Sequence, residues 1–170
     1  GRGMVKSIRQ SIQQGKPFPS VGTEALIALI RTADLVADAV GQSLADANLS
    51  MQQYNVLRIL RGSGAEGLRT YEVVPRMVSR APNITRLVDK LEEKGLLERT
   101  RSKSDRRAIR LRLTRAGLRL IDRLDDAVTV ADAQAMRGLS EAELRRLVGL
   151  LDRLRHPLEQ EHDGTVRRTG

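Results

Sequence analysis

The stretch from Ser79 to Gly95 constrains the fold most, because it predicts an amphipathic helix with an abrupt end. Ser79 can accept a hydrogen bond from the first turn, and Pro82 falls early enough in that turn to be tolerated. Gly95 is the residue type that commonly follows the last helical turn. The apolar residues at helical spacing are Ile84, Leu87, Val88 and Leu91, and the polar residues opposite them are Asn83, Arg86 and Lys90. We therefore expect one buried face and one exposed recognition face.

Two short strands joined by a polar tip are expected after this helix. Apolar and basic residues alternate in the second strand, as they do in a half-buried strand. The apolar ones are Ile109, Leu111 and Leu113, and the basic ones are Arg110 and Arg112. The tip spans Lys103 to Arg107. A polar-faced helix followed by a basic hairpin indicates a winged helix-turn-helix whose partner is double-stranded DNA.

The net charge of +9 is concentrated in this region. Residues 76–119 contain 14 Lys and Arg and five Asp and Glu, whereas the rest of the chain contains 16 of each sign. Clustered basic residues make nucleic-acid binding strong and salt-dependent, because neutralised phosphates release counterions. A basic face that is merely solvated is the alternative, but an excess confined to one motif favours DNA binding.

The exposed helix face carries residue types that suit the edges of bases. Asn83 suits adenine, Arg86 suits guanine and Thr85 suits a thymine methyl group. Phosphates, which position a protein without specifying sequence, suit Lys90, Arg99 and Arg112. The full set of predicted DNA-binding residues is Ser79, Arg80, Pro82, Asn83, Thr85, Arg86, Lys90, Arg99, Lys103, Asp105, Arg106, Arg107 and Arg112. The rival hypothesis is an architectural protein that coats DNA with little sequence preference and uses the same arginines.

The hairpin sequence resembles that of the MarR family of bacterial transcription regulators. In that family the wing carries Asp-x-Arg, followed by a hydrophobic residue and Thr-x-x-Gly; here these residues are Asp105, Arg107, Leu113, Thr114 and Gly117. The resemblance covers roughly residues 24–159 and includes the segments that begin at Ser50 and Ile84. It implies that Arg107 enters the minor groove and that Asp105 holds it, although Asp105 could also be a plain turn residue.

The resemblance also implies a fold class and a mode of action. The fold would be mainly α with a small β-wing, in which N- and C-terminal helices form a homodimer. The function would be that of a transcriptional regulator, a homodimeric repressor released from a partly palindromic operator by a small aromatic or anionic effector. Tyr54 and Arg58 could line the effector pocket, although Tyr54 also suits a core position.

The domain organisation follows from helix signals and breakers. Residues 1–20 are expected to form an N-terminal arm, of which 1–3 look like a tag remnant, and residues 21–160 a MarR-type domain. Within it, the winged helix-turn-helix spans about 50–117 and the dimerisation helices about 22–47 and 115–160, before a polar tail at 161–170. Capping boxes begin at Ser50 and Ser140. Thr70 is expected to cap the first helix of the helix-turn-helix, which Pro75 should kink or delay.

Both terminal helices carry one-sided apolar stripes. Such stripes are most often intramolecular core, but these lie outside the winged-helix unit, so a second chain could bury them. The predicted dimerisation residues are Leu26, Leu29, Ile30, Leu144, Leu147, Leu151, Leu154 and Leu158.

The residues that could support catalysis or bind a metal are few. The chain has no Cys, which excludes disulfides and thiolate metal sites. His156 and His162 lie six residues apart with Pro157 between them, so they do not share a helical face as a metal pair would. Asp125 and Asp126 are adjacent on a predicted helix, and we expect both to be solvated. No enzymatic activity, cofactor or metal is therefore predicted.

The longest apolar run, Ala25 to Ile30, is far shorter than the roughly 20 residues that span a bilayer. A cytoplasmic protein without membrane contact is expected.

Overall fold

The computed structural model describes residues 4–79, 83–101 and 108–168, with the side chains of 162–168 excluded. The chain divides into two compact units, Gly1–Ala131 and Asp132–Gly170, and each is described by itself. Among the described residues, no helix combines the length and apolarity needed to cross a bilayer.

The first unit begins with an arm and a long helix. The arm contains the short helix α1 (Ile8–Ser11), which contacts α2 (Val21–Gln42). The 3-10 helix η1 (Ala45–Ala47) follows α2. Of the apolar stripe on α2, only the C-terminal end is buried, at Val40 and then at Leu44 just beyond the helix.

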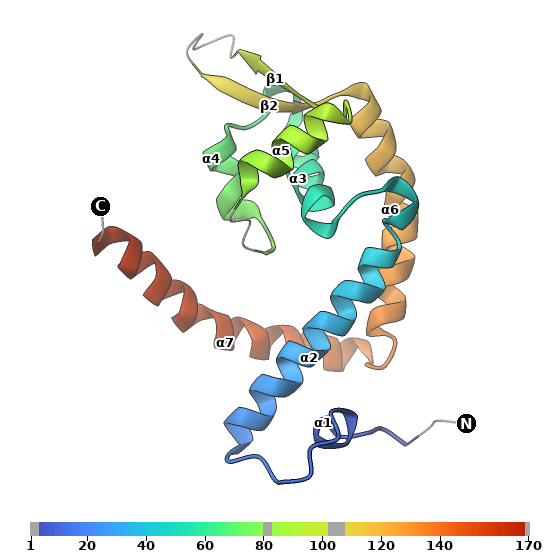
Figure 1. Ribbon diagram of the computed structural model, residues 1–170, viewed down its shortest axis with the longest axis vertical. Helices are drawn as coiled ribbons and strands as arrows, with labels where there is room; N and C mark the ends of the chain where they lie inside the picture. Colours follow the sequence, from blue (N-terminus) through green and yellow to red (C-terminus); the bar gives the residue numbers. More distant parts are fainter. Residues whose placement is uncertain (1–3, 80–82, 102–107, 169–170) are drawn as a thin grey trace. The chain divides into compact units, whose positions relative to one another are not determined.

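The winged-helix core follows. Its elements are α3 (Met51–Gly62), η2 (Gly64–Glu66), α4 (Thr70–Val73), η3 (Val74–Arg76), α5 (Ile84–Glu93), β1 (Leu97–Arg101) and β2 (Ile109–Leu113). Helix α3 contacts α4, α5 and β2, and α5 also contacts β1 (Figure 1). The largest fully buried side chains come from several of these elements and include Leu57, Leu60, Val88, Leu91, Leu97 and Leu111. As predicted, Ser50 and Gln53 form a capping box that starts α3.

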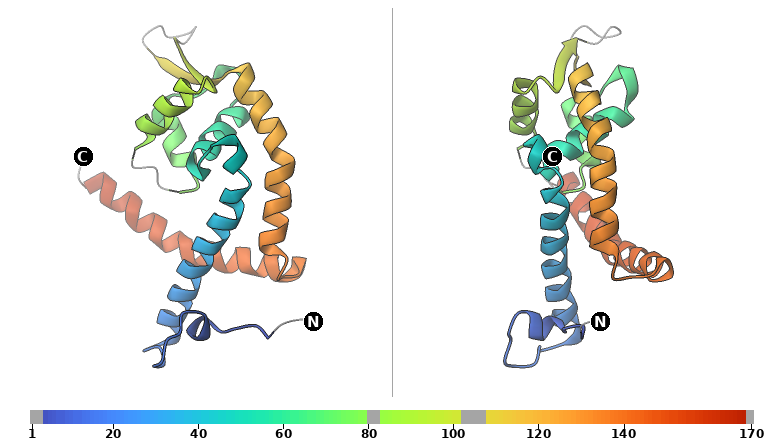
Figure 2. Two further views of the ribbon diagram at one scale, coloured as in Figure 1. Left: turned by 45° about the vertical axis from the view of Figure 1, so that its right-hand side comes forward. Right: turned by 90° about the vertical axis from the view of Figure 1, so that its right-hand side faces the viewer.

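Strands β1 and β2 form the antiparallel hairpin of the wing, at one end of this unit (Figure 2). Leu97 pairs with Leu113, and Arg101 pairs with Ile109. Leu68 adds an isolated bridge to Leu111, through backbone hydrogen bonds of 3.1 and 2.7 Å. Gly67 permits this approach, because it has φ +67° and a Cβ atom there would lie 2.3 Å from the carbonyl oxygen of Leu111.

Helix α6 (Arg115–Met136) starts against the beginning of the wing. The backbone N–H of Thr114 donates to the carbonyl of Leu96 at 3.1 Å, and its hydroxyl donates to the carbonyl of Gly95 at 2.6 Å. That hydroxyl also accepts from the N–H of Gly117 at 3.0 Å, so Thr114 caps α6. The Thr-x-x-Gly pattern therefore joins the end of α5, the wing and α6.

The second unit contains the last residues of α6 and the helix α7 (Glu141–Arg168). The predicted capping box at its start is present: the N–H of Ser140 donates to Glu143 Oε2 at 2.7 Å, and the N–H of Glu143 donates to Ser140 Oγ at 3.4 Å. The hydrogen bonds from Ser140 lower the pKa of Glu143. Pro157 lies inside α7. Its ring removes one backbone donor, but the helix continues past it.

Two predicted helix starts are wrong, and one predicted disturbance is confirmed. Helix α5 begins at Ile84 with Asn83 at its N-cap, not at Ser79. Pro82 disfavours helical backbone in the residue before it, which opposes a helix that starts at Ser79. Helix α4 is preceded by Arg69, whose N–H donates to Glu72 Oε2 at 2.7 Å, so Thr70 is its first residue and not its cap. As expected from Pro75, the α-helix ends after four residues and continues as η3.

Candidate nucleic-acid interface

The exposed face of α5 carries the three residues predicted to read bases and Lys90, which is predicted to contact a phosphate. Asn83, Thr85, Arg86 and Lys90 are all exposed, whereas Val88 and Leu91 on the opposite side are fully buried and Ile84 and Leu87 are half-buried. The helix ends as predicted at Gly95, which has φ +67° and donates its N–H to the carbonyl of Glu92 at 2.8 Å. A helix with one face packed and one face free can enter a major groove.

Asn55 of α3 anchors the segment that leads into α5. Its Oδ1 atom accepts a hydrogen bond from the backbone N–H of Val78 at 2.7 Å. The side chain of Val78 is almost fully exposed, so this backbone bond fixes the segment while leaving the side chain outside the core. Ser79, which follows it, is exposed.

Arg99, a predicted phosphate contact, is engaged in ion pairs within the domain. Its guanidinium is half-buried and makes ion pairs with Asp89 and Glu92 of α5. The hydrogen bond that Arg99 donates to Asp89, together with the ion pair to Glu92, raises the pKa of Arg99. Because both partners belong to α5, Arg99 ties β1 to this helix and its charge is balanced within the domain.

The arginines of β2 are also partly engaged. Arg110 and Arg112 are half-buried, and Arg110 Nη1 donates to the carbonyl of Gly67 at 3.0 Å. Leu111 is the one buried residue of the strand's apolar set; Ile109 is exposed and Leu113 is half-buried. The predicted alternation therefore holds only at the centre of the strand.

Several predicted DNA-binding residues lie outside the described part of the chain. These are Arg80, Pro82, Lys103, Asp105, Arg106 and Arg107.

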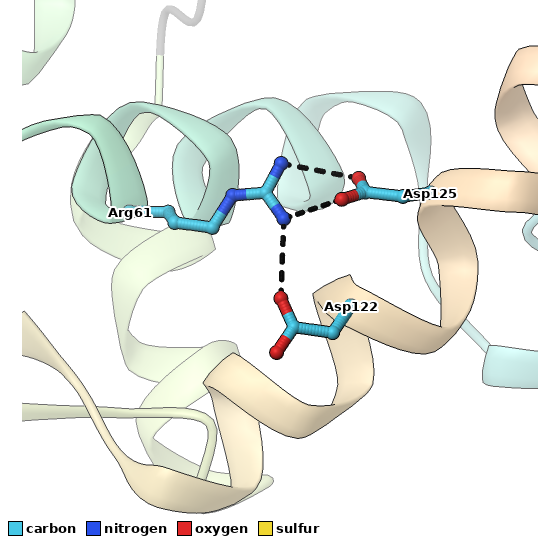
Figure 3. Close-up of polar contacts among 3 residues, drawn as sticks. All are labelled: Arg61, Asp122 and Asp125. Carbon is cyan, nitrogen blue, oxygen red and sulfur yellow. Dashed lines mark hydrogen bonds and ion pairs between the residues drawn. The ribbon is translucent and has the colours of Figure 1, made fainter.

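An ion-pair cluster joins α3 to α6 (Figure 3). Arg61 donates two hydrogen bonds to Asp125, from Nη1 to Oδ2 at 2.6 Å and from Nη2 to Oδ1 at 3.1 Å, and Nη1 also approaches Asp122 Oδ1 at 3.3 Å. The hydrogen bond from Arg61 lowers the pKa of Asp125 and raises that of Arg61 itself. The prediction that Asp125 is merely solvated is therefore wrong, because a bidentate partner holds it; Asp126 is exposed.

Tyr54 and Arg58 form a local pair on α3. Tyr54 is buried, and the guanidinium carbon of Arg58 lies 5.9 Å from the centre of its ring. The Tyr54 hydroxyl is buried and has no hydrogen-bond partner within the described residues. In the described part of the chain, no three His, Cys, Asp or Glu side chains gather closely enough to hold a metal ion.

Asn55 and Arg61 were not identified from the sequence. Their partners lie 23 and 64 residues away, and neither residue belongs to a local motif that marks the pairing. Only the packing of α3 against its neighbours brings them together.

The arrangement of α3, α4, α5 and the β1–β2 hairpin is that of a winged helix-turn-helix DNA-binding domain. A sequence model of the MarR family matches residues 49–109. The chain is 37% identical to a MarR transcription factor from Planctomyces limnophilus, and the two structures match with a TM-score of 0.62 over 80% of this chain and 98% of that one.

Two further structures have the same fold. CouR from Rhodococcus jostii RHA1 is 29% identical, with a TM-score of 0.68 over 81% of this chain and 95% of that one. BpsR from Bordetella bronchiseptica is 23% identical, with a TM-score of 0.69 over 82% and 97% of the two chains. The chain belongs to the MarR family of DNA-binding transcriptional regulators.

Proposed function

We propose that the protein is a sequence-specific regulator in which α5 reads bases in the major groove of DNA. The observation that carries this proposal is the exposed face of α5, where the side chains of Asn83, Thr85 and Arg86 are exposed and the other face of the helix is packed. Arg86 is suited to the O6 and N7 atoms of guanine, and Asn83 to adenine. Lys90 is suited to a phosphate.

The wing would supply the adjacent contact. By resemblance to the family, Arg107 enters the minor groove, where width and negative potential matter more than base identity. Because Arg99 is balanced by acidic partners, we assign the wing's contribution to its tip and not to β1.

We further propose that two chains form a two-fold dimer. Leu26 and Ile30 on α2 and Leu154 and Leu158 on α7 are at least half exposed within their own units, as expected of residues that another chain covers. Of the other predicted dimerisation residues, Leu29 is 36% exposed, and Leu144, Leu147 and Leu151 are half-buried. A two-fold dimer would present two copies of α5, so the operator would be a partial palindrome with half-sites about 10 base pairs apart.

The dimer is tested by sedimentation with one matched pair of variants. Leu158→Glu places a charge on the apolar stripe, and Gln160→Glu places the same charge at an exposed polar position two residues away. We expect the wild type and Gln160→Glu to sediment as dimers and Leu158→Glu to shift towards monomer. A monomeric wild type at micromolar concentration would contradict the proposal.

Regulation by a small molecule is proposed from the relatives. CouR was solved bound to p-coumaroyl-CoA, and DNA binding by BpsR is regulated by 6-hydroxynicotinic acid. We propose that an aromatic or anionic effector releases this protein from its operator as a repressor. The unpartnered hydroxyl of Tyr54 and the guanidinium of Arg58 are groups that such an effector could engage.

Thermal-shift screening with phenolic acids, followed by a DNA-release assay, tests regulation by an effector. If no compound alters DNA affinity, a ligand-independent role is favoured.

Enrichment of random duplexes on the wild-type protein tests the main proposal. A regulator should select a partly palindromic sequence and protect it symmetrically in a footprint. An architectural protein, the alternative, should return no consensus and bind selected and random duplexes alike.

A further inference from the structure

A groove of about 940 Å³ lies between the exposed face of α5 and the segment from η1 to the start of α3. Among the described residues, the charged ones that line it belong to the α5 side: Arg86, Lys90 and Lys94 are basic, and Glu93 is acidic. The opposite wall, drawn from residues 45–53, contributes only uncharged lining residues, such as Asn48 and Ser50. The groove therefore carries a net positive charge.

Lys94 closes one end of this groove. Its ammonium group donates a hydrogen bond to the carbonyl of Asn48, which holds the charge across the gap between α5 and the opposite wall. Arg86 lies at the other end, where the helix begins and where base reading is proposed. Lys90 lies between them and lines the same groove.

The spacing of these charges suits a nucleic-acid strand. Residues four apart on a helix are separated by about 6 Å along its axis, so the distance from Arg86 to Lys94 is about 12 Å. One strand of DNA presents a phosphate about every 3.4 Å along the duplex axis, so more than one phosphate falls within a span of this length. A small effector with one carboxylate would engage only one of these positions.

Two of the three acidic residues of α5 do not cancel this charge. Asp89 and Glu92 pair with Arg99 on the β1 side of the helix, and neither lines the groove. Glu93 is the one acidic residue among the described residues that line it.

We propose that this groove holds the phosphate backbone of one DNA strand beside the major groove that α5 reads, with Lys94 as an additional phosphate contact. The inference rests on the proposed function. It adds the groove beside α5 to a DNA-binding surface that otherwise consists of α5 and the wing. Because Glu93 lines the same groove, its negative charge repels the phosphates and weakens DNA binding.

Two substitutions with opposite expected effects test this. Lys94→Gln should weaken binding to selected and random duplexes equally, and should lower the slope of log affinity against log salt by about 0.9, the value of one phosphate contact. Glu93→Gln should tighten binding to both duplexes. Two controls change the net charge equally at exposed positions outside the groove: Lys16→Gln and Asp38→Asn.

Lys94→Arg separates charge from local structure. It keeps the positive charge, so it should retain the wild-type salt slope even if the hydrogen bond to Asn48 is altered. Melting temperatures measured alongside identify any variant that loses binding by unfolding.

The outcomes separate this inference from the proposed function. If the wild type binds no DNA, the proposed function fails. If the wild type binds DNA but Lys94→Gln and Glu93→Gln match the Lys16→Gln and Asp38→Asn controls, the groove does not hold the backbone. A melting temperature that rises with inorganic phosphate in the wild type but not in Lys94→Gln, with an unchanged DNA salt slope, would assign the groove to a small anion and overturn the inference.

Discussion

Substitution of Gly117 by Ala should destabilise the winged-helix unit, although alanine favours helix. A Cβ atom at this position would lie 2.0 Å from the carbonyl oxygen of Leu96 and 3.0 Å from its carbonyl carbon. Both contacts are with backbone, so either the start of α6 or the start of the wing would have to move by about 1 Å to reach even the tightest contact that real Cβ atoms make. Such a shift would break the hydrogen bond of 3.1 Å from the N–H of Thr114 to the carbonyl of Leu96.

The expected magnitude follows from three terms. Overpacking destabilises the fold by about 1–3 kcal/mol and the lost hydrogen bond by about 1 kcal/mol, whereas the higher helix propensity of alanine stabilises it by about 1 kcal/mol. We therefore expect a loss of about 1–3 kcal/mol in the free energy of unfolding. For a chain of this size, each kcal/mol corresponds to a fall of about 2–4 °C in melting temperature.

Urea and thermal unfolding measure this, with Gly41→Ala as the matched control. Gly41 lies inside α2 of the same unit, and a Cβ atom there would meet only Met51 Cγ at 3.7 Å, an ordinary contact. Gly41→Ala should therefore stabilise the protein, by up to about 1 kcal/mol. If Gly117→Ala is as stable as the wild type, the close approach of α6 to Leu96 is not a constraint and the reasoning fails.

Two further predictions concern contacts that side chains of α3 make with neighbouring segments. The Arg61 ion pair lowers the pKa of Asp125, so the pair stabilises the folded state above the ordinary Asp pKa of about 3.9, and this contribution is lost as pH falls through the lower folded value. The free energies of unfolding of Asp125→Asn and of the wild type, measured in urea, should therefore differ most near pH 7 and converge as pH falls below about 4. A difference independent of pH would refute this. Asn55→Ala should lower the preference for the selected operator over random duplex, because the Val78 N–H loses its acceptor and the segment before α5 loses its anchor. Fluorescence anisotropy with both duplexes measures this, and an unchanged preference would show that the contact does not position α5.

Local sequence signals predicted the elements that depend on neighbouring residues. The capping boxes at Ser50 and Ser140, the helix end at Gly95 and the disturbance at Pro75 all arise within a few residues, and all are present. The predicted start of α5 at Ser79 is wrong: the serine side chain suits a helix cap, but Pro82 disfavours helical backbone in the residue before it.

Local sequence signals do not predict which side chains pair across the fold. A basic residue such as Arg99 looks identical in sequence whether it meets a phosphate or an acidic partner, and only the packing of β1 on α5 shows that it meets Asp89 and Glu92. The same holds for Asp125, which becomes an ion-pair partner once α3 and α6 are placed together. Charge counts located the DNA-binding region but did not divide its residues between internal pairs and free contacts.

The most direct test of the account compares Arg86→Ala with Lys90→Ala on the selected operator and on a scrambled duplex, at several salt concentrations. Both side chains are exposed on α5, one turn apart. Arg86→Ala should cost about 1–3 kcal/mol on the operator and little on the scrambled duplex, because a side chain that reads a base supplies discrimination. Lys90→Ala should weaken both duplexes about equally and lower the salt slope by about one unit. If Arg86→Ala weakens both duplexes equally, α5 does not read sequence through that residue, and the architectural alternative becomes the better explanation.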